Sequence, residues 1–296
     1  MRCPKSLLWH TGGVRLAALL AIFASISTAQ DLRAIIRRAV ELDARNVQLG
    51  RGYTFQERRA LHELDGSGKV RRDEIRTFDV IPMEGTAYRR LIARNDVPLP
   101  AEEQRYEEEK LHFNEQQRLK ETPAERQKRI GDWERRQQQR LHDPLKELPD
   151  AFDFKSAGEA VLDGRAVYVI DATPHKGYQP KSTAAEYFPK VKARLWIDKA
   201  EGQWVKVEAQ TLDTISFAAI LFRVAKGSRY EAEQTRVAEG LWAPKHVWYK
   251  AAARIALVKV VQLEVDTRLS DYRKPNAPTA IPKVRGSADG RNGGSH

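Results

Sequence analysis

The chain has 296 residues, a formal net charge of +11 and a single cysteine. This length suits one large domain or two small ones, and one cysteine excludes a framework of disulfide bonds, so an ordinary apolar core must hold the fold. The basic residues are spread among many acidic ones, and no basic block has interleaved aromatic residues, which argues against a nucleic-acid-binding groove.

The first 29 residues have the pattern of a targeting segment. Three basic residues precede an apolar run at 16–26, and small residues occupy positions 27–29. The run is shorter than the roughly 20 apolar residues of a membrane span, so we predict a cleavable signal peptide at 1–29. Its removal would take away Cys3 and three basic residues, which leaves an exported chain with a net charge of +8.

Residues 31–49 are predicted to form a helix. Asp31 is positioned to cap it, and one side carries apolar residues at helical spacing: Leu32, Ile35, Ile36, Ala39 and Val40. Such a helix packs on the body of the protein or, in the alternative, lies on a membrane surface. Three strands are predicted next, at 53–64, 69–81 and 84–94, with a glycine-containing turn between the first two.

The segment 98–148 differs from the rest because it is rich in Glu, Arg, Gln and Lys. Opposite charges recur at helical spacing, and the sequence from Thr122 to Glu125 fits a capping box with proline at the first helical position. We therefore predict an inserted charged helical hairpin, with helices at about 101–121 and 123–141. It is a lid, a partner-binding arm or a solvated insertion.

Residues 151–272 return to strand patterns, and no helical pattern interrupts them. The clearest hairpin lies at 190–212, where two runs of alternating apolar and polar residues flank a short turn that contains Gly202. Short connections make the sheet antiparallel. Residues 273–296 are rich in Pro and Gly, and we predict a disordered tail there. The fold class is therefore α+β, with a curved antiparallel sheet.

The hairpin sequence Leu195-Trp196-Ile197-Asp198-Lys199, followed by Val205-Lys206-Val207-Glu208, resembles the LolA-like superfamily when taken with the signal peptide, the helix and the strand meander. This superfamily comprises periplasmic outer-membrane lipoprotein-sorting proteins, the lipoprotein receptor LolB and RseB-type stress sensors. The resemblance covers about residues 31–272, so we expect one LolA-like domain at 30–272. It implies a periplasmic location and an unclosed antiparallel β-barrel, with helices over its mouth and a hydrophobic cavity for acyl chains.

A carrier of acyl chains needs an apolar concavity rather than catalytic residues, because removing each CH₂ from water gains about 0.8 kcal/mol. We expect no catalytic residue, no metal site and no cofactor. The candidate lipid-binding residues are the apolar side chains expected on the concave face: Tyr53, Phe55, Phe78, Leu91, Leu195, Ile197, Val205, Val207, Phe217 and Phe222. The alternative is that these side chains simply form the packed core.

The predicted function is non-enzymatic carriage of lipid or lipoprotein acyl chains, with a role in outer-membrane lipoprotein sorting. The expected partners are a lipid or acylated protein and a membrane-surface or envelope protein, with a monomeric chain and no nucleic acid. One alternative is an envelope stress sensor or scaffold of RseB type that uses the helical arm to contact a partner. Another is an exported hydrolase, but the sequence has no G-x-S-x-G elbow and no H-E-x-x-H motif.

Overall fold

A single antiparallel sheet dominates the computed structural model, which describes residues 13–139, 143–217, 222–255 and 259–275. Eleven strands follow one another in the order β4-β3-β2-β1-β13-β12-β11-β8-β7-β6-β5, and β9 and β10 pair beside β12. The strands are β1 (Thr54–Leu64), β2 (Val70–Met83), β3 (Thr86–Arg94), β4 (Val97–Pro98), β5 (Phe152–Leu162), β6 (Arg165–Pro174), β7 (Val191–Asp198), β8 (Trp204–Thr211), β9 (Ile215–Phe217), β10 (Phe222–Val224), β11 (Arg229–Ala238), β12 (Leu241–Ile255) and β13 (Lys259–Arg273).

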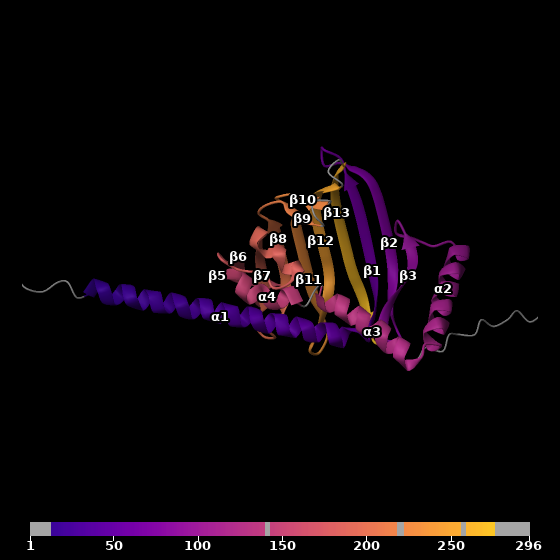
Figure 1. Ribbon diagram of the computed structural model, residues 1–296, viewed down its shortest axis with the longest axis horizontal. Coiled ribbons are helices and arrows are strands. Elements are labelled where there is room, and N and C mark those ends of the chain that lie inside the picture. The colour runs from indigo at the N-terminus through magenta and orange to yellow at the C-terminus, as the bar shows by residue number, and fades with distance from the viewer. Residues whose placement is uncertain (1–12, 140–142, 218–221, 256–258, 276–296) are drawn as a thin grey trace, which may run out of the picture.

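The helices lie along one end and one side of this sheet (Figure 1). They are α1 (Gly13–Gly50), α2 (Ala101–Leu119), α3 (Pro123–Gln137), α4 (Asp143–Ala151) and the 3₁₀ helix η2 (Thr183–Lys190). In Figure 1, α1 crosses the sheet near the lower ends of the strands, α3 lies beyond it below β1, and α2 stands beside β3. The predicted α+β fold with an unclosed, curved antiparallel sheet is confirmed.

Most predicted elements are present, with differences at their ends. The helical pair of the insertion is confirmed as α2 and α3, and Thr122 makes the predicted capping box with Glu125. Two helices were not predicted: α4 contains Pro149 in its interior, where proline normally interrupts a helix, and η2 lies within 151–272, where the sequence shows no helical pattern. The strands of this region include two short ones, β9 and β10.

The N-terminal and C-terminal predictions reach beyond the described residues. Helix α1 begins at Gly13 rather than at residue 31, so it continues through the predicted cleavage site, and the signal peptide at 1–29 stays a prediction. The last strand extends to Arg273, and residues 276–296 of the predicted tail lie outside the described residues.

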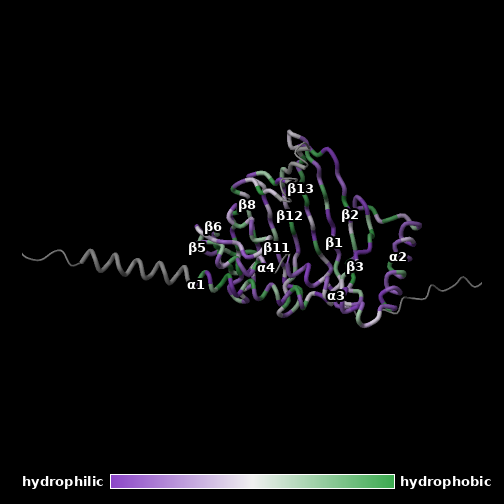
Figure 2. The backbone as a smooth tube through the Cα atoms, in the orientation of Figure 1, coloured by the Kyte–Doolittle hydropathy of each residue, from purple (hydrophilic) through white to green (hydrophobic). Residues whose placement is uncertain are grey.

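The sheet has two faces of different chemistry, because successive side chains on a strand point to opposite sides. In register across β6, β7, β8, β11 and β12, one face carries Ile170, Leu195, Val207, Ala232 and Val247. The neighbouring row on the other face is Asp171, Arg194, Glu208, Glu231 and Trp248. We call these the apolar face and the polar face. Figure 2 shows hydrophobic and hydrophilic positions interleaved along the strands.

The main core lies where α1 and α4 cover the apolar face of β5–β8. Ile36 of α1 and Ala151 of α4 are buried against Ile170, Leu195 and Ile197. Each of these side chains is at most 9% exposed. The apolar stripe predicted on the N-terminal helix therefore packs on the sheet, as expected for an amphipathic helix of a globular protein.

The hairpin β7–β8 is held by Asp198, which is only 1% exposed. Its carboxylate accepts bonds from Arg165 Nε at 2.7 Å and from the backbone N–H groups of Ala200 at 3.0 Å and Glu201 at 2.7 Å. Burial alone would raise the pKa of Asp198, but these donors hold it below its ordinary value. The Trp-Ile-Asp-Lys sequence thus fixes a turn.

Candidate functional site

The middle of the apolar face carries uncharged rows of side chains that continue beyond α1. One row runs in register from Ala209 on β8 through Tyr230, Tyr249 and Val265 to Leu61 on β1. The next row along β12 and β13 pairs Ala251 with Leu263. We call these residues the central apolar patch: Leu61, Ala209, Tyr230, Tyr249, Ala251, Leu263 and Val265.

Protein surrounds and desolvates two tyrosines of β11 and β13. The Tyr230 side chain is 42% exposed, yet surrounding protein, and then the Asp43 carboxylate, raise the pKa of its hydroxyl. The half-buried Tyr272, which stacks on Phe55 with ring centroids 5.0 Å apart, has its pKa raised for the same primary reason.

Helix α1 borders the central apolar patch through buried polar contacts. Asp43 Oδ1 accepts bonds of 2.9 Å from both Trp204 Nε1 and Gln234 Nε2. One turn further on, Asn46 Nδ2 donates to Gln203 Oε1 at 3.0 Å. Hydrogen bonds of this kind are directional, so they fix where α1 crosses the strands. Within the patch Val265 is buried, whereas Tyr230 is exposed.

The structure separates the predicted lipid-binding residues into groups. Leu195 and Ile197 are buried beneath α1, and Val207 packs against them, so these three belong to the core in this structure. Phe55, Phe78 and Leu91 are half-buried on β1, β2 and β3, on the far side of the central apolar patch.

Charged residues surround the group formed by Phe55, Phe78 and Leu91. Arg89 lies over the Phe78 ring, 4.2 Å from its centroid, and donates to Glu57 Oε1 at 2.5 Å. Glu57 lies in register between Leu269 and Phe78 on the same face. The apolar character of the face therefore ends near β1, because β1–β3 have charged residues on both faces.

Val205 lies on the polar face, although strict alternation in β8 placed it beside Val207. A β-bulge opposite Trp196 and Ile197 inserts one extra residue in β8, and Val205 packs with Val167 and Trp242 instead. Tyr53 is half-buried at the start of β1, with Lys274 5.8 Å from its ring centroid. The side chains of Phe217 and Phe222 lie outside the described part of the structure.

The sequence did not single out the residues at the centre of the candidate site. Tyr230 and Tyr249 lie on β11 and β12, and Leu61 lies on β1, far away in the sequence. Alternation within each strand was visible, but only strand order shows that these positions share one row. A sequence signal for this row would be an uncharged residue at the matching register position of each strand.

The described cavities lie elsewhere. Cavities of about 460 Å³ and 390 Å³ open on the polar face, and one of about 510 Å³ lies along α3. None of the ten predicted lipid-binding residues lines these three. Within the described residues, no group of three or more His, Cys, Asp or Glu side chains is arranged to hold a metal ion.

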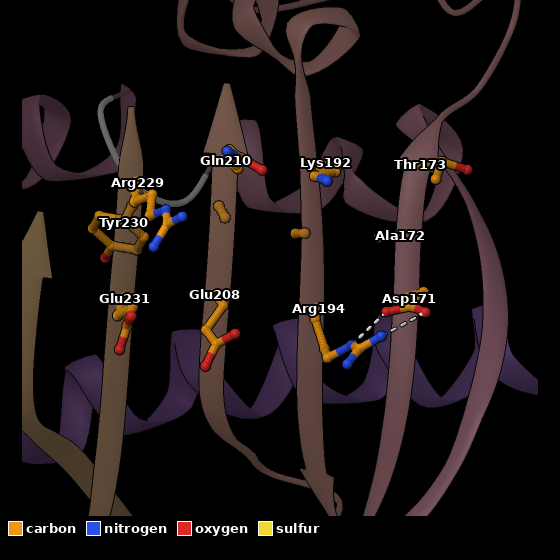
Figure 3. A pocket seen from close by; sticks show the side chains of 12 residues that line it. Asp171, Ala172, Thr173, Lys192, Arg194, Glu208, Gln210, Arg229, Tyr230 and Glu231 are labelled. Carbon is orange, nitrogen blue, oxygen red and sulfur yellow. Dashed lines mark hydrogen bonds and ion pairs between the residues drawn. The ribbon is translucent and has the colours of Figure 1, made fainter. Parts of the chain in front are cut away.

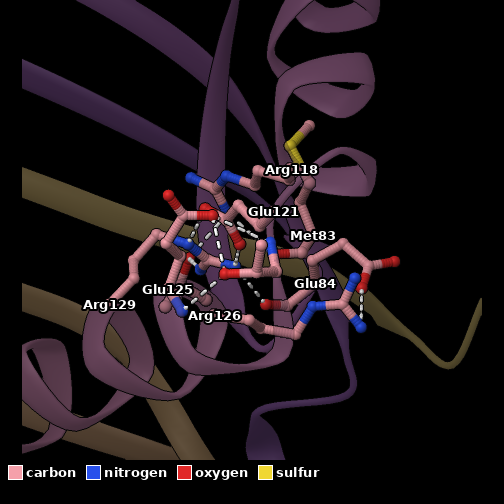
Figure 4. A network of polar contacts seen from close by, with 9 residues as sticks. Met83, Glu84, Arg118, Glu121, Glu125, Arg126 and Arg129 are labelled. Carbon is pink, nitrogen blue, oxygen red and sulfur yellow. Dashed lines mark hydrogen bonds and ion pairs between the residues drawn. The ribbon is translucent and has the colours of Figure 1, made fainter.

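The charged insertion is firmly attached to the sheet rather than free in solvent. Arg118 of α2 donates to the Met83 carbonyl at 2.7 Å and to Thr86 Oγ1 at 2.6 Å. Arg129 of α3 donates to the same hydroxyl at 3.0 Å and to the Glu84 carbonyl at 3.0 Å. Figure 4 shows these arginines converging on the turn between β2 and β3.

Close packing supports the same attachment. Gly85 has a φ of +85°, and a Cβ atom there would lie 2.5 Å from Cδ1 of Ile130 on α3. Glu121 accepts from Arg129 Nε at 2.6 Å and keeps the two helices together. In contrast, Tyr106 and Phe113 of α2 are 61% and 62% exposed.

No helix among the described residues has both the length and the apolar character to cross a membrane. No protein-family model matches the chain, and no curated protein matches it.

Several solved structures are similar to the chain at the level of the fold. One is a putative outer membrane lipoprotein-sorting protein domain from Vibrio parahaemolyticus, with 11% identity, a TM-score of 0.35, and coverage of 82% of this chain and 94% of that one. A LolA superfamily protein from Nitrosomonas europaea has 12% identity, a TM-score of 0.32 and coverage of 84% and 94%. MucB in the Pseudomonas aeruginosa MucA/MucB complex has 12% identity, a TM-score of 0.22 and coverage of 81% and 100%.

These similarities agree with the LolA-like resemblance seen in the sequence, and they concern the fold alone. Identities of 11–12% and such TM-scores say nothing about which ligand or partner this chain binds.

Proposed function

We propose that this chain is a non-enzymatic periplasmic carrier that binds acyl chains of a lipid or lipoprotein on its central apolar patch. The observation that supports this most is the uncharged row from Ala209 to Leu61, which crosses five strands and in which Tyr230 remains 42% exposed. An acyl chain laid on it would lose contact with water at about 0.8 kcal/mol per CH₂. The cellular role of such a carrier would be in outer-membrane lipoprotein sorting.

The proposal places the ligand beside α1 rather than beneath it. Leu195 and Ile197 are already covered by Ile36 and its neighbours, so they support the site without lining it. Tyr230 and Leu263, which remain partly accessible, are the residues that we expect to touch the ligand.

Binding of a fluorescent fatty acid, together with native mass spectrometry of protein purified from the envelope, tests this proposal. Leu263→Glu and Tyr230→Ala should each weaken binding about tenfold or more, since one buries a charge in the patch and the other removes a contacting ring. Val161→Glu is the matched control, because Val161 is 74% exposed on the edge strand β5. Leu195→Glu should prevent folding.

Two results would reject the carrier. One is a wild-type protein that neither retains lipid nor binds the fatty acid. The other is an equal loss of binding in Val161→Glu and in the two patch variants, which would mean that no particular surface is used. Tyr230→Ala keeps the test valid if Leu263→Glu does not fold.

A second candidate function is an envelope sensor or scaffold of RseB type, in which the arm contacts a partner protein. The exposed Tyr106 and Phe113 on an otherwise charged and well-anchored α2 favour it. Replacing both by Ser should then abolish capture of the partner and leave fatty-acid binding unchanged. A pure carrier would show no change in either measurement.

A further inference from the structure

Much of the polar face of the sheet carries paired charges. Arg194 donates two hydrogen bonds to Asp171, of 2.6 Å and 3.0 Å. Lys206 lies within 4 Å of three glutamates, Glu208, Glu231 and Glu233. Opposite charges placed across neighbouring strands stabilise a sheet, so this pattern needs no functional explanation.

One row on this face breaks the pattern. Lys192 on β7, Gln210 on β8, Arg229 on β11 and Lys250 on β12 lie side by side in register. We call these four residues the cationic row. Arg229 is directly opposite Lys250, and like charges in that position destabilise a sheet.

The cationic row has few carboxylates to balance it. Among the described residues, Lys192, Arg229 and the nearby Lys226 make no ion pair, and Lys250 has only Glu264, at 3.2 Å. Glu264 is shared, because Trp248 Nε1 also donates to it at 3.0 Å. Since neighbouring strands are about 4.8 Å apart, Lys192 and Arg229 are separated by about 10 Å, with the Gln210 amide between them.

A groove runs along the cationic row. The cavity of about 460 Å³ lies between this row, including Thr173, and the mainly acidic row of Asp171, Arg194, Glu208 and Glu231. Its floor is strand backbone, because the alanines at 172, 193 and 209 have their small side chains on the apolar face. Figure 3 shows Lys192, Gln210 and Arg229 of the cationic row beside the mainly acidic row, with α1 behind the sheet.

The groove continues past Arg229 into the second cavity, of about 390 Å³, which Trp248, Lys250 and Lys226 line. Arg229 lines both cavities and is therefore at the centre of the whole groove. The loop with Lys226 and Gly227 forms this end of the groove, between β10 and β11.

We propose that this groove binds a phosphate group that is linked to a polar or cationic body. Lys192, Arg229, Lys250 and Lys226 take the phosphate oxygens, with Arg229 supplying a planar pair of donors and the lysines acting as point charges. The acidic wall of Glu208 and Glu231 repels a second anion, so the rest of the ligand is neutral or cationic. The phosphate belongs to a lipid headgroup or to a soluble phosphate ester.

This site is independent of the proposed acyl carrier because it lies on the opposite face of the sheet. A ligand here touches no residue of the central apolar patch except the backbone near Ala209 and Tyr230. A variant that no longer binds acyl chains can therefore still be tested for phosphate binding, and the reverse.

The test uses the full chain at low ionic strength, where charge interactions are least screened. O-phosphoethanolamine is titrated by calorimetry, and vesicles of phosphatidylethanolamine with phosphatidylglycerol are compared with vesicles of a phosphate-free glycolipid in a sedimentation assay. We expect the double variant Lys192→Gln/Arg229→Gln to lose at least tenfold in affinity for whichever probe the wild type binds. Without ligand, the single variant Arg229→Gln should melt at the same temperature as the wild type or higher, because a like-charge pair is removed.

Lys155→Gln is the control for a general loss of positive charge. Lys155 is exposed on the polar face of β5, but it lies opposite Asp171 and outside the groove. Binding of O-phosphoethanolamine supports a soluble ester, and binding of the anionic vesicles alone supports a lipid headgroup. The proposal is overturned if neither probe binds the wild type, or if Lys155→Gln weakens binding as much as the double variant.

Discussion

The two ends of the sheet keep their helices in different ways. At the β5–β8 end, α1 and α4 bury apolar side chains such as Ile36, Ile170 and Ile197 almost completely. At the β1–β3 end, α2 and α3 are attached by arginines that donate to the carbonyls of Met83 and Glu84 and to the hydroxyl of Thr86. The first end gains stability mainly from removing apolar surface from water, and the second mainly from directional hydrogen bonds.

This difference explains where the candidate lipid site lies. The covered end is packed, and the β1–β3 end carries charges on both faces of its strands, so among the described residues the middle of the sheet is where uncharged side chains such as Tyr230 and Leu263 remain accessible.

Truncation of apolar side chains should give the largest contrast. Ile197→Ala at the covered end should cost about 3–4 kcal/mol of unfolding free energy, because it leaves a cavity in a packed core. Leu91→Ala at the other end is half-buried and should cost only about 1 kcal/mol. Urea unfolding followed by circular dichroism measures both, and equal costs would mean that the two ends are packed alike.

The anchor of the β7–β8 turn should give the next largest effect, with a distinct pH dependence. Asp198→Ala removes the partner of Arg165 and of two N–H groups, and should cost about 2–3 kcal/mol at neutral pH. Because the folded-state pKa of Asp198 is lowered, its stabilisation is present above the unfolded pKa of about 4 and is lost as the pH falls through the lower folded value.

Asp198→Asn separates the two contributions of this carboxylate. The amide oxygen keeps an acceptor for Ala200 and Glu201 but loses the charge that faces Arg165. The difference in stability between wild type and Asp198→Asn should shrink below about pH 4. A difference that stays constant down to pH 2 would contradict the role given to the Arg165 ion pair.

The attachment of the arm should give the smallest effect. Gly85→Ala forces a Cβ against Ile130 and places a side chain at positive φ, which should cost about 1–2 kcal/mol. Gly68→Ala is the matched control, since Gly68 also has a positive φ but has no neighbour within 4 Å of the added atom. Limited proteolysis should then cut the arm faster in Gly85→Ala than in Gly68→Ala, and equal rates would show that the packing of Ile130 does not hold the arm.

Local chemistry in the sequence was sufficient to predict most of the helices and strands, although not α4 and η2. Alternation predicted β7 and β8, the capping box of Thr122 and Glu125 predicted the start of α3, and helical spacing predicted the covered stripe of α1. These signals depend on neighbours within a few residues, and so they do not need the tertiary structure. The role of Arg118 and Arg129 was not predicted, because their partners are far away in the chain.

Local patterns along the chain are enough to predict an α+β protein with an antiparallel sheet, a charged helical arm and an apolar N-terminal helix face. Which positions share a face depends on the folded sheet: one bulge moves Val205 away from Val207, and the pairing of β1 with β13, far apart in the chain, aligns Leu61 with Val265. The physical reason is that strand register comes from long-range pairing, whereas alternation is a property of each strand alone.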